Sequence, residues 1–172
     1  MNRRRLVVAG VVVAGLAVSI TAAAAANRGG GGLVKDVRKA TKEFRDVEAA
    51  TDAGYAQFLD CVDEPGEGAM GIHFVHGDRV GDIVLDPATP EALVYEPQAD
   101  GSLELVAAEL IVFQEAWDEA NDHPPVVAGH HFHLVTVPNR YDLPAFYQLH
   151  VWAGRDNPSG DFNDWNPKVS CP

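Results

Sequence analysis

From Cys61 onward the chain consists of short apolar runs separated by glycine, proline and aspartate. This pattern is typical of short β-strands joined by tight turns. Four of the runs carry a polar side chain where strand alternation would favour another hydrophobic one. These side chains belong to His73, Glu109, His133 and His150. Because burying a polar group without a partner costs several kcal/mol, four such insertions in one small protein indicate a shared role.

The same runs predict the fold class. We expect strands over 71–75, 93–97, 103–113, 130–137 and 145–153, with a shorter one around 80–85. Asp100 and Gly101 favour a hairpin between the second and third of these, since this pair readily adopts the positive-φ positions of a turn. Residues 114–122 favour a short helix or turn. Strands this short and regularly spaced predict a mainly β (α+β) fold, a small antiparallel β-barrel or sandwich.

An amphipathic helix precedes the strands. Apolar residues recur at three- and four-residue steps from Leu33 through Val37 and Phe44 to Ala50, with charged residues between them. This spacing places them on one face of a helix, which we expect to pack outside the β domain. Residues 33–172 are predicted to form a single globular domain, long enough to bury a core.

The first 26 residues have the composition of an export signal. Arg3, Arg4 and Arg5 precede an uncharged apolar run that ends in the small residues 22–26, which suit cleavage. The run is also long enough to span a bilayer as a helix, so an uncleaved membrane anchor is the alternative. A glycine-rich linker follows over 27–32. We expect an exported protein, secreted or associated with the cell envelope, that contacts a membrane only if the first segment is retained.

The charge of the chain excludes one class of partner. The sequence has 13 basic and 25 acidic side chains, and loss of Arg3, Arg4 and Arg5 would make the balance more acidic still. A strongly acidic surface repels polyanions, so we expect no binding to nucleic acid. It is compatible with a soluble surface outside the cell and with cationic partners.

Two cysteines, Cys61 and Cys171, enclose almost the whole predicted β region. In an exported chain, a small even number of cysteines is typical of a disulfide. The alternative, a pair of metal-binding thiolates, would favour further soft ligands nearby, and neither cysteine has them. We therefore predict a Cys61–Cys171 disulfide that ties the carboxyl terminus to the start of the β region.

Strand alternation indicates which polar side chains share a face, because successive residues point to opposite sides of a sheet. Glu109 falls on the same face as Ile111 and Phe113. If the faces of the different strands line one interior, the inward set is His73, Glu109, His133 and His150, with His131 as a further candidate. Imidazoles and a carboxylate held on strands suit one divalent transition metal ion, copper, zinc, iron or manganese.

The same residues also fit a protein without a metal. Glu109 beside a protonated histidine would form a buried ion pair, and the set would then be a hydrogen-bonded core network in a structural or ligand-binding β-barrel. Other chemistries find no support in the sequence. The serines lack the glycine pattern of a nucleophile elbow, and the chain has no phosphate-binding loop and no dinucleotide fingerprint.

Two resemblances bear on this interpretation. Strand-borne histidines with one glutamate loosely resemble the metal site of cupin-type barrels, although here the H-x-H of residues 131–133 follows Glu109 and has no glutamate shortly after it. The segments Met70–Val75, Leu143–Trp152, Asn157–Gly160 and Asp164–Pro167 resemble those of a group of small exported bacterial proteins of uncharacterised function. The first resemblance implies a cupin-like barrel, and the second implies no activity or ligand.

The sequence thus predicts an exported metal-binding β domain with a mononuclear His/Glu site. Two roles are compatible with such a site. One is sequestration of the metal outside the membrane, and the other is a metal-dependent enzyme acting on a small-molecule substrate.

Overall fold

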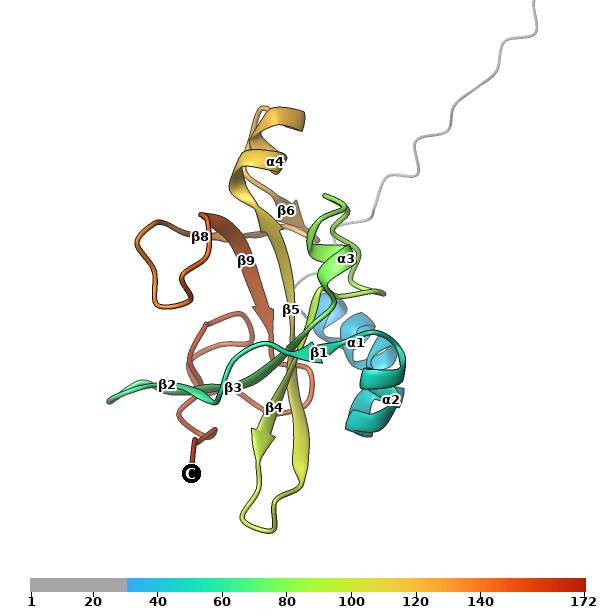
Figure 1. Cartoon of the computed structure of the whole chain (residues 1–172), viewed down its shortest axis with the longest axis vertical. Helices are drawn as coiled ribbons and strands as arrows, with labels where there is room; N and C mark the ends of the chain where they lie inside the picture. The colour runs from blue at the N-terminus through green and yellow to red at the C-terminus, as the bar shows by residue number, and fades with distance from the viewer. Residues whose placement is uncertain (1–30) are drawn as a thin grey trace, which may run out of the picture.

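A computed structural model describes residues 31–172 and shows one open antiparallel β-sheet with helices packed against it (Figure 1). The sheet has the order β1-β3-β4-β5-β9-β8, with β2 also paired to β3. Its strands are β1 (Ala56–Gln57), β2 (Val62–Glu64), β3 (Gly68–Val75), β4 (Ala92–Pro97), β5 (Leu103–Phe113), β8 (His133–Val135) and β9 (Phe146–Val151). A second, two-stranded sheet pairs β6 (Val126–Val127) with β7 (His130–His131).

The mainly β prediction is confirmed, but the predicted closure is not found. β1 and β8 lie at opposite ends of the sheet, and within residues 31–172 nothing pairs them. The described strands therefore form neither a closed barrel nor a cupin-like one. The predicted signal or anchor over 1–26 and most of the linker lie outside the described residues. Gly31 and Gly32, assigned to the linker, instead form the start of the first helix.

The predicted amino-terminal helix is present but divided into three segments. These are α1 (Gly31–Ala40), the 3₁₀ helix η1 (Lys42–Arg45) and α2 (Val47–Asp52). The buried Thr41 hydroxyl donates to the carbonyl of Val37 at 2.9 Å, and the Asp46 carboxylate accepts from the Glu48 N–H at 3.0 Å. Such local bonds from threonine and aspartate end one helical segment and begin the next.

Two other expectations need correction. The run around 80–85 forms no strand: α3 (Gly77–Val80) is followed by a turn in which the Asp82 carboxylate accepts from the Val84 N–H at 2.8 Å. This local bond competes with strand pairing. The predicted strand over 130–137 is split at Phe132 between β7 and β8. The helix expected over 114–122 is α4 (Gln114–Ala120).

The two faces of the sheet have different partners. One face carries Phe74, Leu93, Leu110 and Leu149, which pack with Leu33, Val37 and Phe44 of the amino-terminal helices into the main core. In Figure 1 these helices lie together on one side of the sheet. The opposite face carries the residues adjacent in sequence to that set, His73, Glu109 and His150 among them. This second face is partly covered by the irregular chain after β9.

The final segment is fixed to the sheet by hydrogen bonds. Ala69 of β3 and Asn166 exchange backbone bonds of 3.2 and 3.1 Å, and the indole of Trp152 donates to the Asn163 carbonyl at 2.6 Å. Gly68 has φ +108°, and a Cβ there would overlap the backbone of Asn166, so only glycine allows this approach. These contacts hold Asp164 over the site face.

The predicted Cys61–Cys171 disulfide is confirmed, with the two Cα atoms 5.6 Å apart. It joins the residue before β2 to the carboxyl-terminal segment over a sequence separation of 110 residues. The bond therefore fixes the same segment that covers the site face. Among the described residues, no helix has the length and apolar character needed to cross a bilayer.

Replacing both cysteines should reveal how much this link stabilises the fold. In the chain-entropy model, closing a loop of this length contributes about 4 to 5 kcal/mol. We expect a Cys61→Ser, Cys171→Ser double variant to lose that amount of free energy of unfolding, measured in guanidinium chloride without reductant. The matched comparison is wild-type protein unfolded with reductant, which should behave like the variant. Equal stability of the variant and the oxidised wild type would contradict this expectation.

A second prediction concerns Glu91, which is 1% exposed just before β4. Its carboxylate accepts from the Ile111 N–H at 3.0 Å, beyond the last β4–β5 pair. Burial raises the pKa of Glu91 to about 8. A carboxyl whose pKa is raised by folding stabilises the protein most below its unfolded pKa, and this contribution is lost as pH rises toward the folded value.

Glu91→Gln keeps the shape and the acceptor oxygen but removes the ionisation. Relative to wild type, we expect the variant to gain about 4 kcal/mol in free energy of unfolding between pH 4 and pH 8. The measurement is urea unfolding across that range. Glu115→Gln, at an exposed position of α4, is the control. Parallel pH curves for wild type and Glu91→Gln would show that the carboxyl does not titrate there.

Candidate functional site

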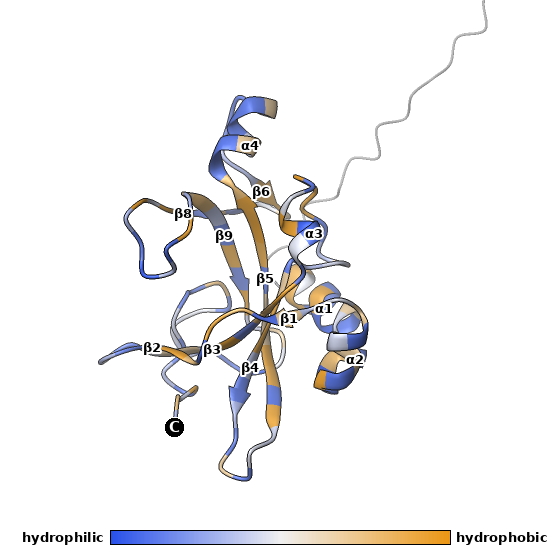
Figure 2. Ribbon diagram, viewed as in Figure 1, coloured by the Kyte–Doolittle hydropathy of each residue, from blue (hydrophilic) through white to orange (hydrophobic). Residues whose placement is uncertain are grey.

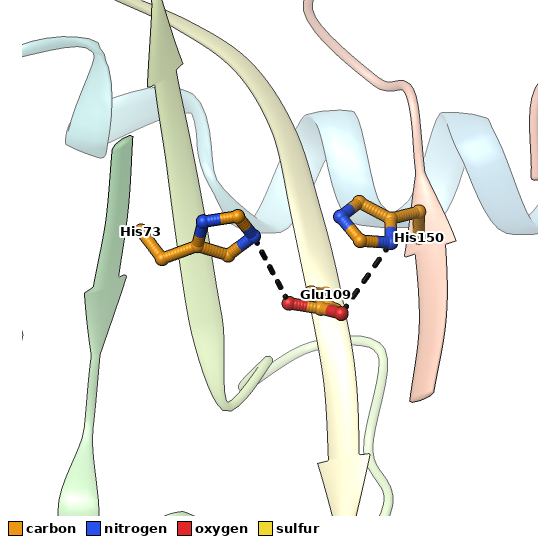
Figure 3. Close-up of side chains that lie close together, drawn as sticks. All are labelled: His73, Glu109 and His150. Atoms are coloured by element: carbon orange, nitrogen blue, oxygen red, sulfur yellow. Dashed lines mark ion pairs between the residues drawn. The ribbon is translucent and has the colours of Figure 1, made fainter. Parts of the chain in front are cut away.

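Three strands of the main sheet supply the central residues of the site, His73 from β3, Glu109 from β5 and His150 from β9 (Figure 3). Glu109 is directly paired in register with His150. His73 lies two strands away from Glu109, with β4 between them. All three are buried, with exposed fractions of 7%, 3% and 0%.

Small residues on β4 allow His73 and Glu109 to meet across the intervening strand. Ala92 is paired with Glu109 on one side and with Val75 on the other, while Val94 is paired with His73. Strands separated by one neighbour lie about 10 Å apart, so only long side chains passing over a small one make contact. The Nε2 atom of His73 lies 3.4 Å from Oε2 of Glu109. Alanine at position 92 therefore leaves the space that the site occupies.

The Glu109 carboxylate lies between the two imidazoles. Its Oε1 atom is 3.4 Å from Nδ1 of His150, and its other oxygen faces His73 (Figure 3). These are ion-pair distances, and the Nδ1 and Nε2 atoms of His150 make no hydrogen bond within residues 31–172. Buried polar atoms in proteins almost always have a partner. The site therefore holds ligand atoms whose bonding capacity the described protein groups do not use.

Asp164 extends the cluster toward the surface. Its Oδ1 lies 3.4 Å from Nδ1 of His150 and 3.2 Å from Nδ1 of His133. The side chain of His133 is 55% exposed, so the prediction that it points inward with the other three is wrong. β8 ends the sheet, which leaves the side chain of His133 partly in solvent and reaching the site only through Asp164. His131 is exposed on β7, outside the main sheet.

Burial and charge set the ionisation of the group. Burial raises the pKa of Glu109 to about 7, and burial, aided by the positive charge on His150, lowers the pKa of His73 to about 3. For His150 burial acts downward, but the Glu109 and Asp164 carboxylates outweigh it and raise the pKa. Burial acts upward on Asp164, yet His150 and His133 lower its pKa to about 2. Burial thus favours the neutral form of His73, whereas the two carboxylates favour the protonated form of His150.

The ligand atoms are arranged closely enough for one metal ion. One atom from each of His73, Glu109 and His150 can be chosen so that all lie within 4.8 Å of one another. In tetrahedral coordination with bonds of about 2.1 Å the ligand atoms lie about 3.4 Å apart, so side-chain shifts would have to bring the most distant pair closer together. The structure thus brings together three of the predicted ligands, while His133 and His131 lie outside this group.

Three residues of the site were not assigned a role from the sequence. Asp164 lies in an irregular loop, where strand alternation gives no information. Gln148 shares the face of His150 and is 3% exposed. Tyr141 lines the same face from the loop before β9, and burial raises the pKa of its hydroxyl to about 12. Of these three residues, only Gln148 could have been found from the sequence, because it is two residues from His150 and so falls on the same face of the strand.

A cavity of about 270 Å³ adjoins the site, with His73, Glu109 and Gln148 in its wall. Comparisons of the chain with protein families, with curated proteins and with solved structures found no match. The site is therefore interpreted from its own geometry, and the resemblance to a group of small exported bacterial proteins stays a prediction.

The link between Asp164 and His150 can be tested in the metal-free protein. Asp164→Asn removes a carboxylate that favours the protonated imidazole, so the pKa of His150 should fall. The measurement is a pH titration of the imidazole nitrogens by ¹⁵N NMR in the presence of a chelator. Asp161→Asn, an exposed change three residues earlier, is the control and should leave the titration unchanged. An unchanged His150 titration in Asp164→Asn would contradict the described electrostatics.

Proposed function

We propose that His73, Glu109 and His150 bind one divalent transition metal ion, and that the protein is an exported metal-binding domain of catalytic type. The observation that supports this most strongly is the convergence of three buried ligand atoms within 4.8 Å from three separate strands. The Cys61–Cys171 disulfide supports the exported part of the proposal, because disulfides persist in oxidising compartments.

The charges of the site favour a dication. Two carboxylates, Glu109 and Asp164, contact His150, and His73 is kept neutral by its surroundings. With both imidazoles neutral, the four side chains carry two negative charges, which a divalent ion would balance. An isolated buried carboxylate is costly unless it is paired or coordinated to metal. A metal would also use one of the two His150 nitrogen atoms, neither of which has a hydrogen bond within the described residues.

The number of ligands indicates a catalytic type of site. Structural zinc sites use four protein ligands, whereas catalytic sites use about three and leave a position open. Two histidines with one carboxylate are also the ligand set of many non-haem Fe(II) oxygenases and of some zinc hydrolases. Here the three ligands border a cavity large enough for more than water. Zn(II) and Fe(II) are therefore the ions that this ligand set suits best, and the chemistry would be activation of a bound water or of O₂.

Sequestration is the second candidate, and Asp164 favours it. Its carboxylate lies 3.4 Å from the His150 ring and could supply a fourth ligand, closing the coordination shell. The two roles differ in a measurable way, because only an open site exchanges a metal-bound water. Water-proton relaxation of the Mn(II)-loaded protein should be enhanced in the catalytic case and not in the sequestering one.

Metal content provides the direct test of the proposal. Protein purified from its native compartment should contain about one transition metal ion per chain. Glu109→Gln and His150→Ala should each lower the affinity for Zn(II) at least about 100-fold, a loss at or above the upper end of that seen for outer-shell changes. The affinity is measured by competition with a chromogenic chelator, and the bound metal by elemental analysis.

His131→Ala is the matched control, since it removes an exposed imidazole that is not part of the cluster. We expect its Zn(II) affinity to equal that of wild type. Substoichiometric metal in wild type, together with Zn(II) affinity that is the same in all four proteins, would overturn the proposal. That result would favour a hydrogen-bonded core network instead.

A further inference from the structure

The cavity beside the site is lined mainly by apolar side chains, several of which lie on the site face of the sheet. Its floor continues the site face of the sheet, through Val75 of β3, Ile111 and Phe113 of β5, and Phe146 of β9. Other lining residues come from α3, from Phe58 and Leu59 after β1, and from Tyr141 and Leu143 before β9. Figure 2 shows the apolar character of β5 toward α4, where this floor lies. The amino-terminal helices cover the other face of the sheet, so none of their side chains fills this space.

One end of the cavity is polar. His73, Glu109 and Gln148 lie in its wall, and the Gln148 residue is only 3% exposed. Within residues 31–172, no hydrogen bond or ion pair involves the Gln148 carboxamide, although its backbone is paired with Ile111 and His133. The amide atoms of Gln148 are not among the fully buried polar atoms that lack a partner, so they open onto the cavity. A polar group of a molecule held there would be in place to hydrogen-bond to this carboxamide.

Size and charge narrow the class of ligand. The cavity has a volume of about 270 Å³, and an apolar cavity of about 150 Å³ holds benzene. The space therefore suits about ten carbon atoms, as a bicyclic ring or a chain of similar bulk. Without a bound cation an anionic ligand would be disfavoured, because Glu109 is at the polar end and the cavity walls offer no Lys or Arg side chain among the described residues.

We propose that this cavity binds a small, uncharged, mainly apolar molecule whose single polar group is hydrogen-bonded by Gln148 next to the His73–Glu109–His150 cluster. This inference names the class of substrate for the proposed function. The molecule would be a substrate only if the proposed metal site is catalytic. The polar group of such a molecule would lie beside the bound metal ion, while the apolar part fills the space between β5 and Leu143.

The test uses the full chain after removal of metal with a chelator, with 2-naphthol as the neutral probe. We expect binding with a Kd of about 10 µM to 1 mM, measured by isothermal titration calorimetry. Naphthalene lacks the hydroxyl and should bind more weakly. The anionic 2-naphthoate should bind at least about tenfold more weakly than 2-naphthol, since its charge would have to be buried next to Glu109.

Three variants locate the binding. Gln148→Leu should weaken 2-naphthol about 3- to 10-fold, the contribution of one neutral hydrogen bond, without weakening naphthalene. Leu143→Trp should fill the cavity and abolish binding of both. This residue lies on an irregular segment before β9, and circular dichroism checks its fold. Leu134→Trp, at an exposed position outside the cavity, is the matched control and should bind like wild type.

The outcomes separate this inference from the proposed function. Absence of 2-naphthol binding to wild type, or equal binding to Leu143→Trp, overturns the inference. Zn(II) affinity is measured on the same preparations. Protein that takes up Zn(II) but not 2-naphthol retains the proposed function and loses this inference. Protein that binds 2-naphthol but not Zn(II) retains the ligand cavity and loses the metal proposal.

Discussion

The burial of the Glu109 carboxylate between two imidazoles is the constraint on which the rest of the site depends. A carboxylate at 3% exposure is costly unless a partner compensates its charge. His73 and His150, each 3.4 Å away, are placed to do so, and Ala92 leaves room for His73 to reach Glu109 across β4. The distances are long for hydrogen bonds. A cation bound among the three residues would compensate the carboxylate charge better than the two imidazoles do alone.

The architecture supports this constraint from both sides of the sheet. The amino-terminal helices bury one face in an ordinary apolar core, which leaves the other face free for polar residues. The carboxyl-terminal segment then crosses that second face, held by the Ala69–Asn166 backbone bonds and by the Cys61–Cys171 disulfide. Asp164 reaches His150 from this segment. The disulfide, at the edge of the domain, thus helps to hold one of the site's charges in place.

Local patterns made the central site predictable from the sequence. Period-2 alternation correctly placed Glu109 with Ile111 and Phe113, because all three lie on the regular part of β5 and line the cavity. Alternation also assigned His133 to the correct face, since it is paired with Gln148, but it could not show that β8 is an edge strand where this side chain is exposed. Asp164 and the open shape of the sheet could not be derived in this way, since both depend on long-range contacts. The 80–85 run was misassigned because the turn at Asp82 is set by one side chain.

The central claim is that one metal ion lies between His73, Glu109 and His150. The most direct measurement is anomalous diffraction from crystals of protein loaded with Zn(II), recorded on both sides of the zinc absorption edge. We predict one strong anomalous peak per chain, about 2.0 to 2.2 Å from an atom of each of the three side chains. A zinc peak elsewhere on the acidic surface, with this cluster lacking one, would contradict the account.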